Sequence, residues 1–143
     1  MNTLIASALA ALLLAGTAPA RAHDDAAIAH LKPPHGGQLR AAGEVHLELV
    51  VATTGAGPAT PVTVYVSDHA GTDVATAGAS ATVTLLSGAT KTTITLRPAG
   101  DNRLAGSGDY RADPGMKAVV SVTLPGKAPA TARFTPLARP APK

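Results

Sequence analysis

The sequence predicts an all-β protein, an antiparallel β-sandwich of about the size of an immunoglobulin or fibronectin type III domain, behind a cleaved signal peptide. Glycine (14) and proline (12) are frequent in the 143 residues and aromatics make up only 2%, a mixture that suits short strands and turns better than long helices. From Glu44 onward, short β-branched runs alternate with turn residues, as in antiparallel sandwiches. No shift in composition marks a second domain.

Residues 1–22 have the pattern of a secretory signal peptide. The apolar run from Leu4 to Ala15 is too short to span a bilayer. Small residues permit cleavage after Ala22 or after Ala20. Thr17 stands where a bacterial lipobox has its cysteine, so we expect no lipid or other membrane anchor. The mature protein is therefore expected in the periplasm.

We expect three regions after the signal peptide. Residues 23–43 form a flexible N-terminal segment, in which Asp24 to Leu31 is the one credible helix because Pro33 and Pro34 end it. Residues 44–136 form the sandwich. Residues 137–143 form a disordered tail.

Alternating apolar side chains predict the strands, most clearly at Val62, Val64 and Val66. Turn-forming residues such as those of Asp113-Pro114-Gly115 separate them. The expected strands are Val45 to Ala52, Val62 to Ser67, Thr72 to Thr76, Thr82 to Leu86, Thr92 to Arg97, Arg103 to Ala105, Ala118 to Leu124 and Thr131 to Thr135.

Several function classes are disfavoured by what the sequence lacks. Without cysteine, thiolate metal sites and thiol nucleophiles are excluded. We find no phosphate loop, dinucleotide fingerprint, His-Glu-x-x-His or nucleophile elbow, so we expect neither an enzyme nor an organic cofactor. A net charge of +3, scattered along the chain, is too small for nucleic-acid binding.

The positions of the histidines indicate a metal site. All five precede residue 70, and imidazole is the commonest protein ligand of transition metals. On the first predicted strand, His46 and Glu48 share one face while Val45, Leu47 and Leu49 share the other. Imidazole with carboxylate suits divalent copper, zinc, cobalt or nickel. Solvated residues on an exposed strand face are the alternative. The candidate ligands are His23, His35, His46, Glu48 and His69.

The mature N-terminus offers a copper ligand set with either cleavage. Cleavage after Ala22 gives His23 a free α-amine beside its imidazole. Cleavage after Ala20 makes His23 the third residue, and a terminal amine with histidine at position three can surround copper(II) or nickel(II) with a square-planar set of nitrogens, the geometry those ions favour.

Gly36 and Gly37 follow His35 and allow two interpretations. Their conformational freedom either folds His35 back toward a metal shared with His46 or His69, or makes the turn that enters the first strand.

Several segments together resemble a known group of proteins. They are Pro34 to Leu39, His46 to Val50, Tyr65 to Gly71, Gly100 to Leu104, and Val119 to Gly126 closing into Ala132 to Phe134. Over about residues 34–136 the chain resembles small exported proteobacterial β-rich proteins and the HGG…LELV segment of periplasmic adaptor subunits of resistance-nodulation-division heavy-metal efflux pumps. The resemblance implies a metal-resistance setting and a periplasmic efflux component as partner. The helical hairpin and lipoyl-like segment of those adaptors are absent from the sequence.

Two functions therefore compete. In the first, the protein is a periplasmic accessory of heavy-metal resistance that binds a divalent transition metal through histidine and carboxylate ligands. In the second, it is a metal-free sandwich that recognises a protein or envelope partner.

Overall fold

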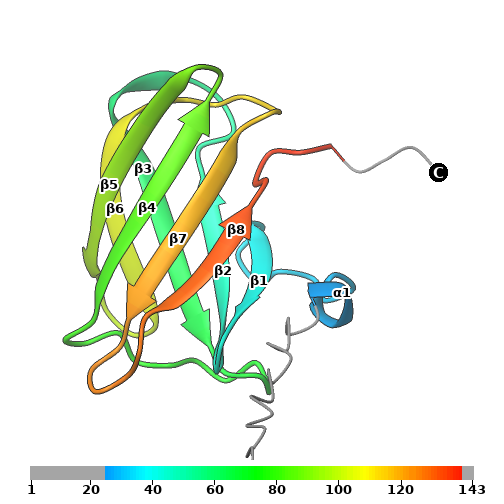
Figure 1. Cartoon of the computed structure of the whole chain (residues 1–143), viewed down its shortest axis with the longest axis vertical. Helices are drawn as coiled ribbons and strands as arrows, with labels where there is room; N and C mark the ends of the chain where they lie inside the picture. Colours follow the sequence, from blue (N-terminus) through cyan, green and yellow to red (C-terminus); the bar gives the residue numbers. More distant parts are fainter. Residues whose placement is uncertain (1–24, 140–143) are drawn as a thin grey trace, which may run out of the picture.

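The computed structural model describes residues 25–139 as one antiparallel β-structure with a short helix at its N-terminal end (Figure 1). The elements are α1 (Asp25–Ile28), β1 (Gln38–Ala42), β2 (Val45–Val51), β3 (Ala56–Ser67), β4 (Ser80–Ser87), β5 (Thr90–Pro98), β6 (Arg103–Arg111), β7 (Lys117–Thr123) and β8 (Ala130–Phe134). The predicted all-β class is confirmed.

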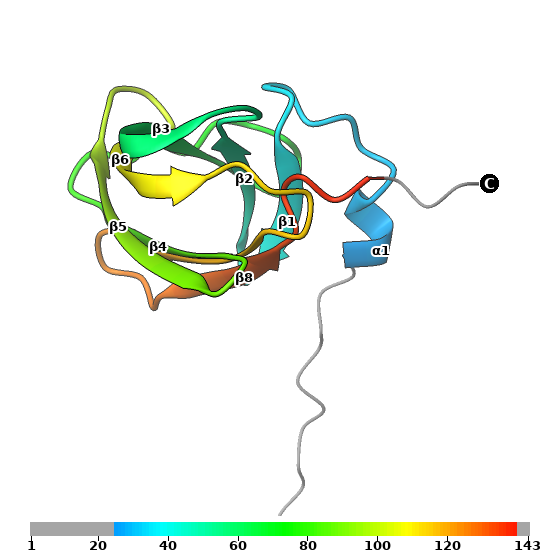
Figure 2. The same ribbon diagram turned by 90° about the horizontal axis from the view of Figure 1, so that it is seen from above.

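The strands join into one nearly closed sheet in the order β1-β2-β3-β6-β5-β4-β7-β8, and every pairing is antiparallel. Seen from above, they surround a central core (Figure 2). The form is closer to a barrel than to two separate sheets. The Gln38 side chain connects the first and last strands: its Oε1 accepts the backbone N–H of Thr135, which directly follows β8, at 2.7 Å.

Alternate residues of the strands fill the core. Val62, Val64 and Val66 of β3 are at most 1% exposed, as the two-residue period of a strand requires. The side chains that are most completely buried are Leu47, Leu49, Leu85, Leu96, Leu104, Met116, Val62, Val64, Val66, Val83, Val120 and Val122. Branched aliphatic side chains therefore hold the sheet together.

The sheet begins earlier than the sequence indicates. The sequence predicts residues 38–42 in a flexible segment, but all five pair with residues 45–49 of β2. Ile28 of α1 is buried, and Leu137, expected in a disordered tail, is partly buried against the core. The ordered domain thus extends beyond residues 44–136 at both ends.

Three predicted strands differ in the structure. The strand expected at Val62 to Ser67 begins at Ala56. The expected strand at Thr72 to Thr76 is reduced to an isolated bridge between Asp73 and Ser67, because these residues directly follow the tight turn that Asp68 fixes. The expected short strand at Arg103 continues to Arg111. Its two glycines let it lie close to β5: a Cβ on Gly106 would stand 2.6 Å from the Thr95 carbonyl oxygen.

Candidate functional site

The candidate site lies on the outer face of β1, β2 and β3. His46 and Glu48 point to this face, because side chains alternate along a strand and the neighbouring Val45, Leu47 and Leu49 point into the core. Across the β2–β3 ladder, Ser67 lies opposite His46 and Tyr65 lies opposite Glu48. These four residues form one polar strip across β2 and β3.

The β2 half of this strip is buried and the β3 half, Tyr65 and Ser67, is partly buried, so the alternative of solvated residues on an exposed strand face is wrong. His46 is 4% exposed and Glu48 is 2% exposed. The segment before β1 covers Glu48 and the turn after β3 brings His69 against His46. Strand periodicity identifies which residues share a face, but these covering segments depend on tertiary contacts.

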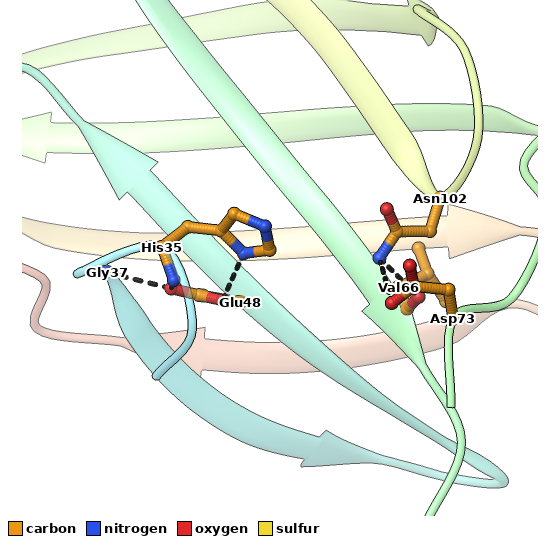
Figure 3. A network of polar contacts seen from close by, with 6 residues as sticks. All are labelled: His35, Gly37, Glu48, Val66, Asp73 and Asn102. Carbon is orange, nitrogen blue, oxygen red and sulfur yellow. Dashed lines mark hydrogen bonds and ion pairs between the residues drawn. The ribbon is translucent and has the colours of Figure 1, made fainter. Parts of the chain in front are cut away.

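Glu48 is the anchor of the segment before β1 (Figure 3). Its Oε1 accepts the backbone N–H groups of His35 and Gly37, at 2.9 and 3.0 Å. Its Oε2 lies 2.8 Å from Nδ1 of the His35 imidazole. Three contacts to one carboxylate satisfy its buried oxygens and set the orientation of the His35 ring.

Tyr65 supports His35 from β3. The two rings are stacked, with centroids 3.5 Å apart and planes within 2° of parallel. With Nδ1 facing Glu48, the His35 ring presents Nε2 as its remaining nitrogen. A histidine whose other ring nitrogen faces a carboxylate is the common second-shell arrangement of metal ligands.

The interpretation that Gly36 and Gly37 make the turn into β1 is confirmed, whereas their folding of His35 toward a shared metal stays a prediction. Gly36 has a φ of 74° and makes the turn, whereas Gly37 lies so close to β2 that a Cβ would collide with the Leu49 carbonyl oxygen. The turn enters β1 and also folds His35 back onto the site, although toward Glu48.

His46 and His69 form the second pair. Their rings meet edge to face, with centroids 4.8 Å apart and an interplanar angle of 85°. His46 Nε2 lies 3.1 Å from His69 Nδ1, and the other nitrogen of His69, Nε2, lies 3.2 Å from the Gly43 carbonyl oxygen. Since that carbonyl can only accept, it favours the tautomer of His69 whose Nδ1 carries a lone pair.

A tight turn holds His69 in place. Asp68 Oδ1 accepts the N–H groups of Ala70 and Thr72, at 2.9 and 2.8 Å, as in an Asx-turn. Gly71 supplies a φ of 82°, which a glycine adopts without strain. The sequence of this turn therefore fixes the imidazole against His46.

The environment of His46 disfavours its protonation. Burial lowers its pKa below the ordinary value of 6.5, the neighbouring His69 lowers it further, and Asp68 partly opposes both effects. The neutral imidazole, which is the form that binds metals, is favoured.

One pocket of about 610 Å³ contains both pairs. It brings together His35, His46, Glu48 and His69, four of the five predicted ligands, while His23 lies outside the described residues. Among residues 25–139, no three histidine or acidic side chains are gathered closely enough to form a metal cluster.

The structure adds pocket residues that the sequence did not identify. Asn102 is 7% exposed and donates from Nδ2 to the Val66 carbonyl oxygen and to Asp73 Oδ1, at 3.1 and 3.0 Å (Figure 3). Together with Tyr65, Asn102 and Asp73 line the pocket. Only Tyr65 could have been found earlier, from the β2–β3 register that places it opposite Glu48.

Comparisons of the chain with protein-family models, curated proteins and solved structures gave no match. In the described range, no helix has both the length and the apolar character needed to cross a membrane.

Proposed function

We propose that this protein is an exported accessory of heavy-metal resistance that binds a divalent transition metal between His46 and His69 and passes it to a periplasmic efflux component. The observation that carries the proposal is the pair of facing imidazole nitrogens, 3.1 Å apart in a polar pocket. The resemblance to efflux adaptors supports the efflux setting.

The separation of the two nitrogens suits a shared metal. With metal–nitrogen bonds of about 2.0–2.1 Å, two ligands are about 3.3 Å apart at a tetrahedral angle and about 2.9 Å apart at a right angle. The observed 3.1 Å lies between these values. In the metal-free protein His46 Nε2 donates its proton to His69 Nδ1 across this distance. Metal binding therefore requires the other His46 tautomer, with the proton on Nδ1, and small rotations of the rings then direct both lone pairs to one ion. The Gly43 carbonyl contact to His69 Nε2 is the outer-shell partner that such a ligand needs.

Two protein ligands leave further coordination positions for water or for a ligand of the receiving protein. That incompleteness fits a carrier, because structural zinc sites are closed by four protein ligands. His35 and Glu48 lie in the same pocket, where they orient the segment above it and can approach the ion. His23 belongs to a separate N-terminal site in this proposal.

Calorimetric titration with copper(II), zinc(II), cobalt(II) and nickel(II) tests the proposal. We expect at least one of the four ions, titrated in competition with the others, to bind with a dissociation constant below about 100 micromolar, equivalent to a binding free energy of roughly 5 kcal/mol. His46→Ala and His69→Ala should each weaken binding at least about tenfold. The matched control is His30→Ala, since His30 is exposed and lies outside the pocket.

Substituting His23→Ala should leave this site intact, because His23 belongs to the separate N-terminal site. If none of the four ions binds the His23→Ala variant below about 100 micromolar, the metal proposal is wrong and the metal-free partner-recognition function replaces it. Loss of affinity in His30→Ala equal to that in His46→Ala would equally contradict the proposed location.

A further inference from the structure

A second pocket, of about 460 Å³, is lined by residues of β4, β5, β7 and β8 together with Arg40 of β1. Figure 2 shows β4 and β8 across the barrel from β2 and β3. Leu86 and Val119 line the pocket. They are 42% and 38% exposed, and in the described part of the chain only one other large hydrophobic side chain is as exposed. The cationic side chains that line the same pocket are Arg40, Lys91, Lys117 and Arg133.

The wall that carries this pocket has no negative charge. Strands β4, β5, β7 and β8 contain no aspartate or glutamate. The register places Lys91 and Lys117 opposite Leu86 on its two sides, and Arg133 opposite Val119. Residues that are directly opposite share a face and have Cα atoms about 4.5–5.5 Å apart. Each exposed apolar side chain therefore has a cation directly beside it.

These cations are not neutralised by the fold. Within residues 25–139, Lys91, Lys117 and Arg133 form no ion pair, and Arg40 has only a 3.9 Å contact to Asp25. Cations gathered around a hollow concentrate positive potential and attract anions. A volume near 460 Å³ lies in the range of small-molecule sites.

We propose that this pocket binds an anionic amphiphile with a single aliphatic chain. Its acidic head contacts Lys91, Lys117 and Arg133, while its methylenes cover Leu86 and Val119. This function goes beyond metal binding and uses none of the same residues.

Two other occupants fit the surface less well. Protein interfaces draw most of their affinity from tryptophan, tyrosine and arginine side chains. This pocket has arginines, but the only aromatic residue of its four strands, Phe134, is 2% exposed. A bilayer is met by apolar side chains that project from the surface, whereas Leu86 and Val119 line a hollow.

Calorimetric titration of the purified protein with decyl phosphate and decanoate, below their micelle concentrations and at low salt, tests the proposal. Both should bind at least about tenfold more tightly than uncharged decyl maltoside or chain-free inorganic phosphate. Lys91→Glu with Lys117→Glu should reduce affinity for decyl phosphate at least about tenfold, and Leu86→Ser should weaken the alkyl anions alone. The matched control is Arg97→Glu, because Arg97 is exposed on β5 but lies outside the pocket.

Circular dichroism checks that the variants fold. Metal affinity should be unchanged in all of them, so that the proposal for this pocket and the metal proposal can be contradicted independently. Equal affinity for charged and uncharged amphiphiles, no binding of either anion below about 1 mM, or an equal loss in Arg97→Glu would overturn the proposal. Binding to phosphatidylglycerol vesicles without binding to decyl phosphate would overturn it as well, by assigning the face to a bilayer.

Discussion

His46 combines burial with a second imidazole as its neighbour, and the structure therefore penalises its charged form. Metal binding benefits directly, because a proton competes with a metal for Nε2. Since the pKa of His46 is lowered, the proposed site should keep its affinity to a somewhat lower pH than an ordinary histidine site.

The same shift predicts how the metal-free protein responds to acid. A group whose pKa is lower in the folded state than in the unfolded state binds fewer protons when folded. Its contribution to stability is fully present above about pH 6.5, the unfolded value, and is lost as the pH falls through the lowered folded-state pKa of His46. Urea unfolding in the presence of a chelator, between pH 8 and pH 5, measures the effect.

The control for this prediction is His46→Gln, which keeps a polar side chain but does not titrate. The other histidines are common to both proteins, so the difference between the two curves reports the charge at position 46. We expect the parent protein to lose more stability than His46→Gln between pH 7 and pH 5. Parallel curves would contradict the assigned environment.

At the scale of elements, the segment from Pro34 to Gly37 determines whether the strip on β2 is buried. Gly37 can lie against β2 only because it has no side chain. We expect Gly37→Ala to lift the segment, break its hydrogen bond to Glu48 and destabilise the protein by about 1–3 kcal/mol. Equilibrium urea unfolding measures the loss, and the ring resonances of His35 report whether it still stacks on Tyr65.

Gly36→Ala provides the comparison. Gly36 has a positive φ, but no atom lies within 4 Å of an added Cβ, so this substitution introduces backbone strain alone, about 1–2 kcal/mol. His35 should remain stacked in Gly36→Ala and not in Gly37→Ala. Unchanged His35 resonances in both variants would show that the close approach of Gly37 does not position the segment.

Alternation predicted most strands correctly because core burial imposes a period of two, as at Val62, Val64 and Val66. It missed β1, whose sequence QLRAA has weak strand propensity and which is only partly buried over most of its length. Pairing with β2 makes it a strand. For the site, periodicity correctly placed His46 and Glu48 on one face. Their burial could not be predicted, since it depends on where the His35 and His69 segments pack.

For the whole molecule, the two proposed sites lie on opposite walls and have opposite requirements. The metal pocket holds the His46 and His69 imidazoles together with the carboxylates of Glu48 and Asp73. The other wall carries cations and no acids. The core between them is aliphatic, so the charges on the two walls interact little across the barrel, and ligands at the two sites should bind independently.

The barrel closes through side chains at the seam between β1 and β8. Gln38 accepts the Thr135 N–H at 2.7 Å, and its Nε2 donates to Thr135 Oγ1 at 3.4 Å. Gln38→Ala removes both contacts. Because both are exposed and water can replace them, we expect a global loss of only about 1 kcal/mol. Local opening should rise more, and amide hydrogen exchange should accelerate in β1 and β8 while β4 stays protected.

Thr131→Ala is the matched control, since it removes a 3.4 Å side-chain contact with Ser121 between β7 and β8 and leaves the seam intact. Exchange in β1 should respond to Gln38→Ala and not to Thr131→Ala. An opened seam would also release the edge that leads into the Gly37 turn, so Gln38→Ala should lower metal affinity modestly even though Gln38 lies outside the metal pocket. If β1 exchanges no faster in Gln38→Ala than in Thr131→Ala, packing of the core, rather than this side-chain bridge, holds the first and last strands together.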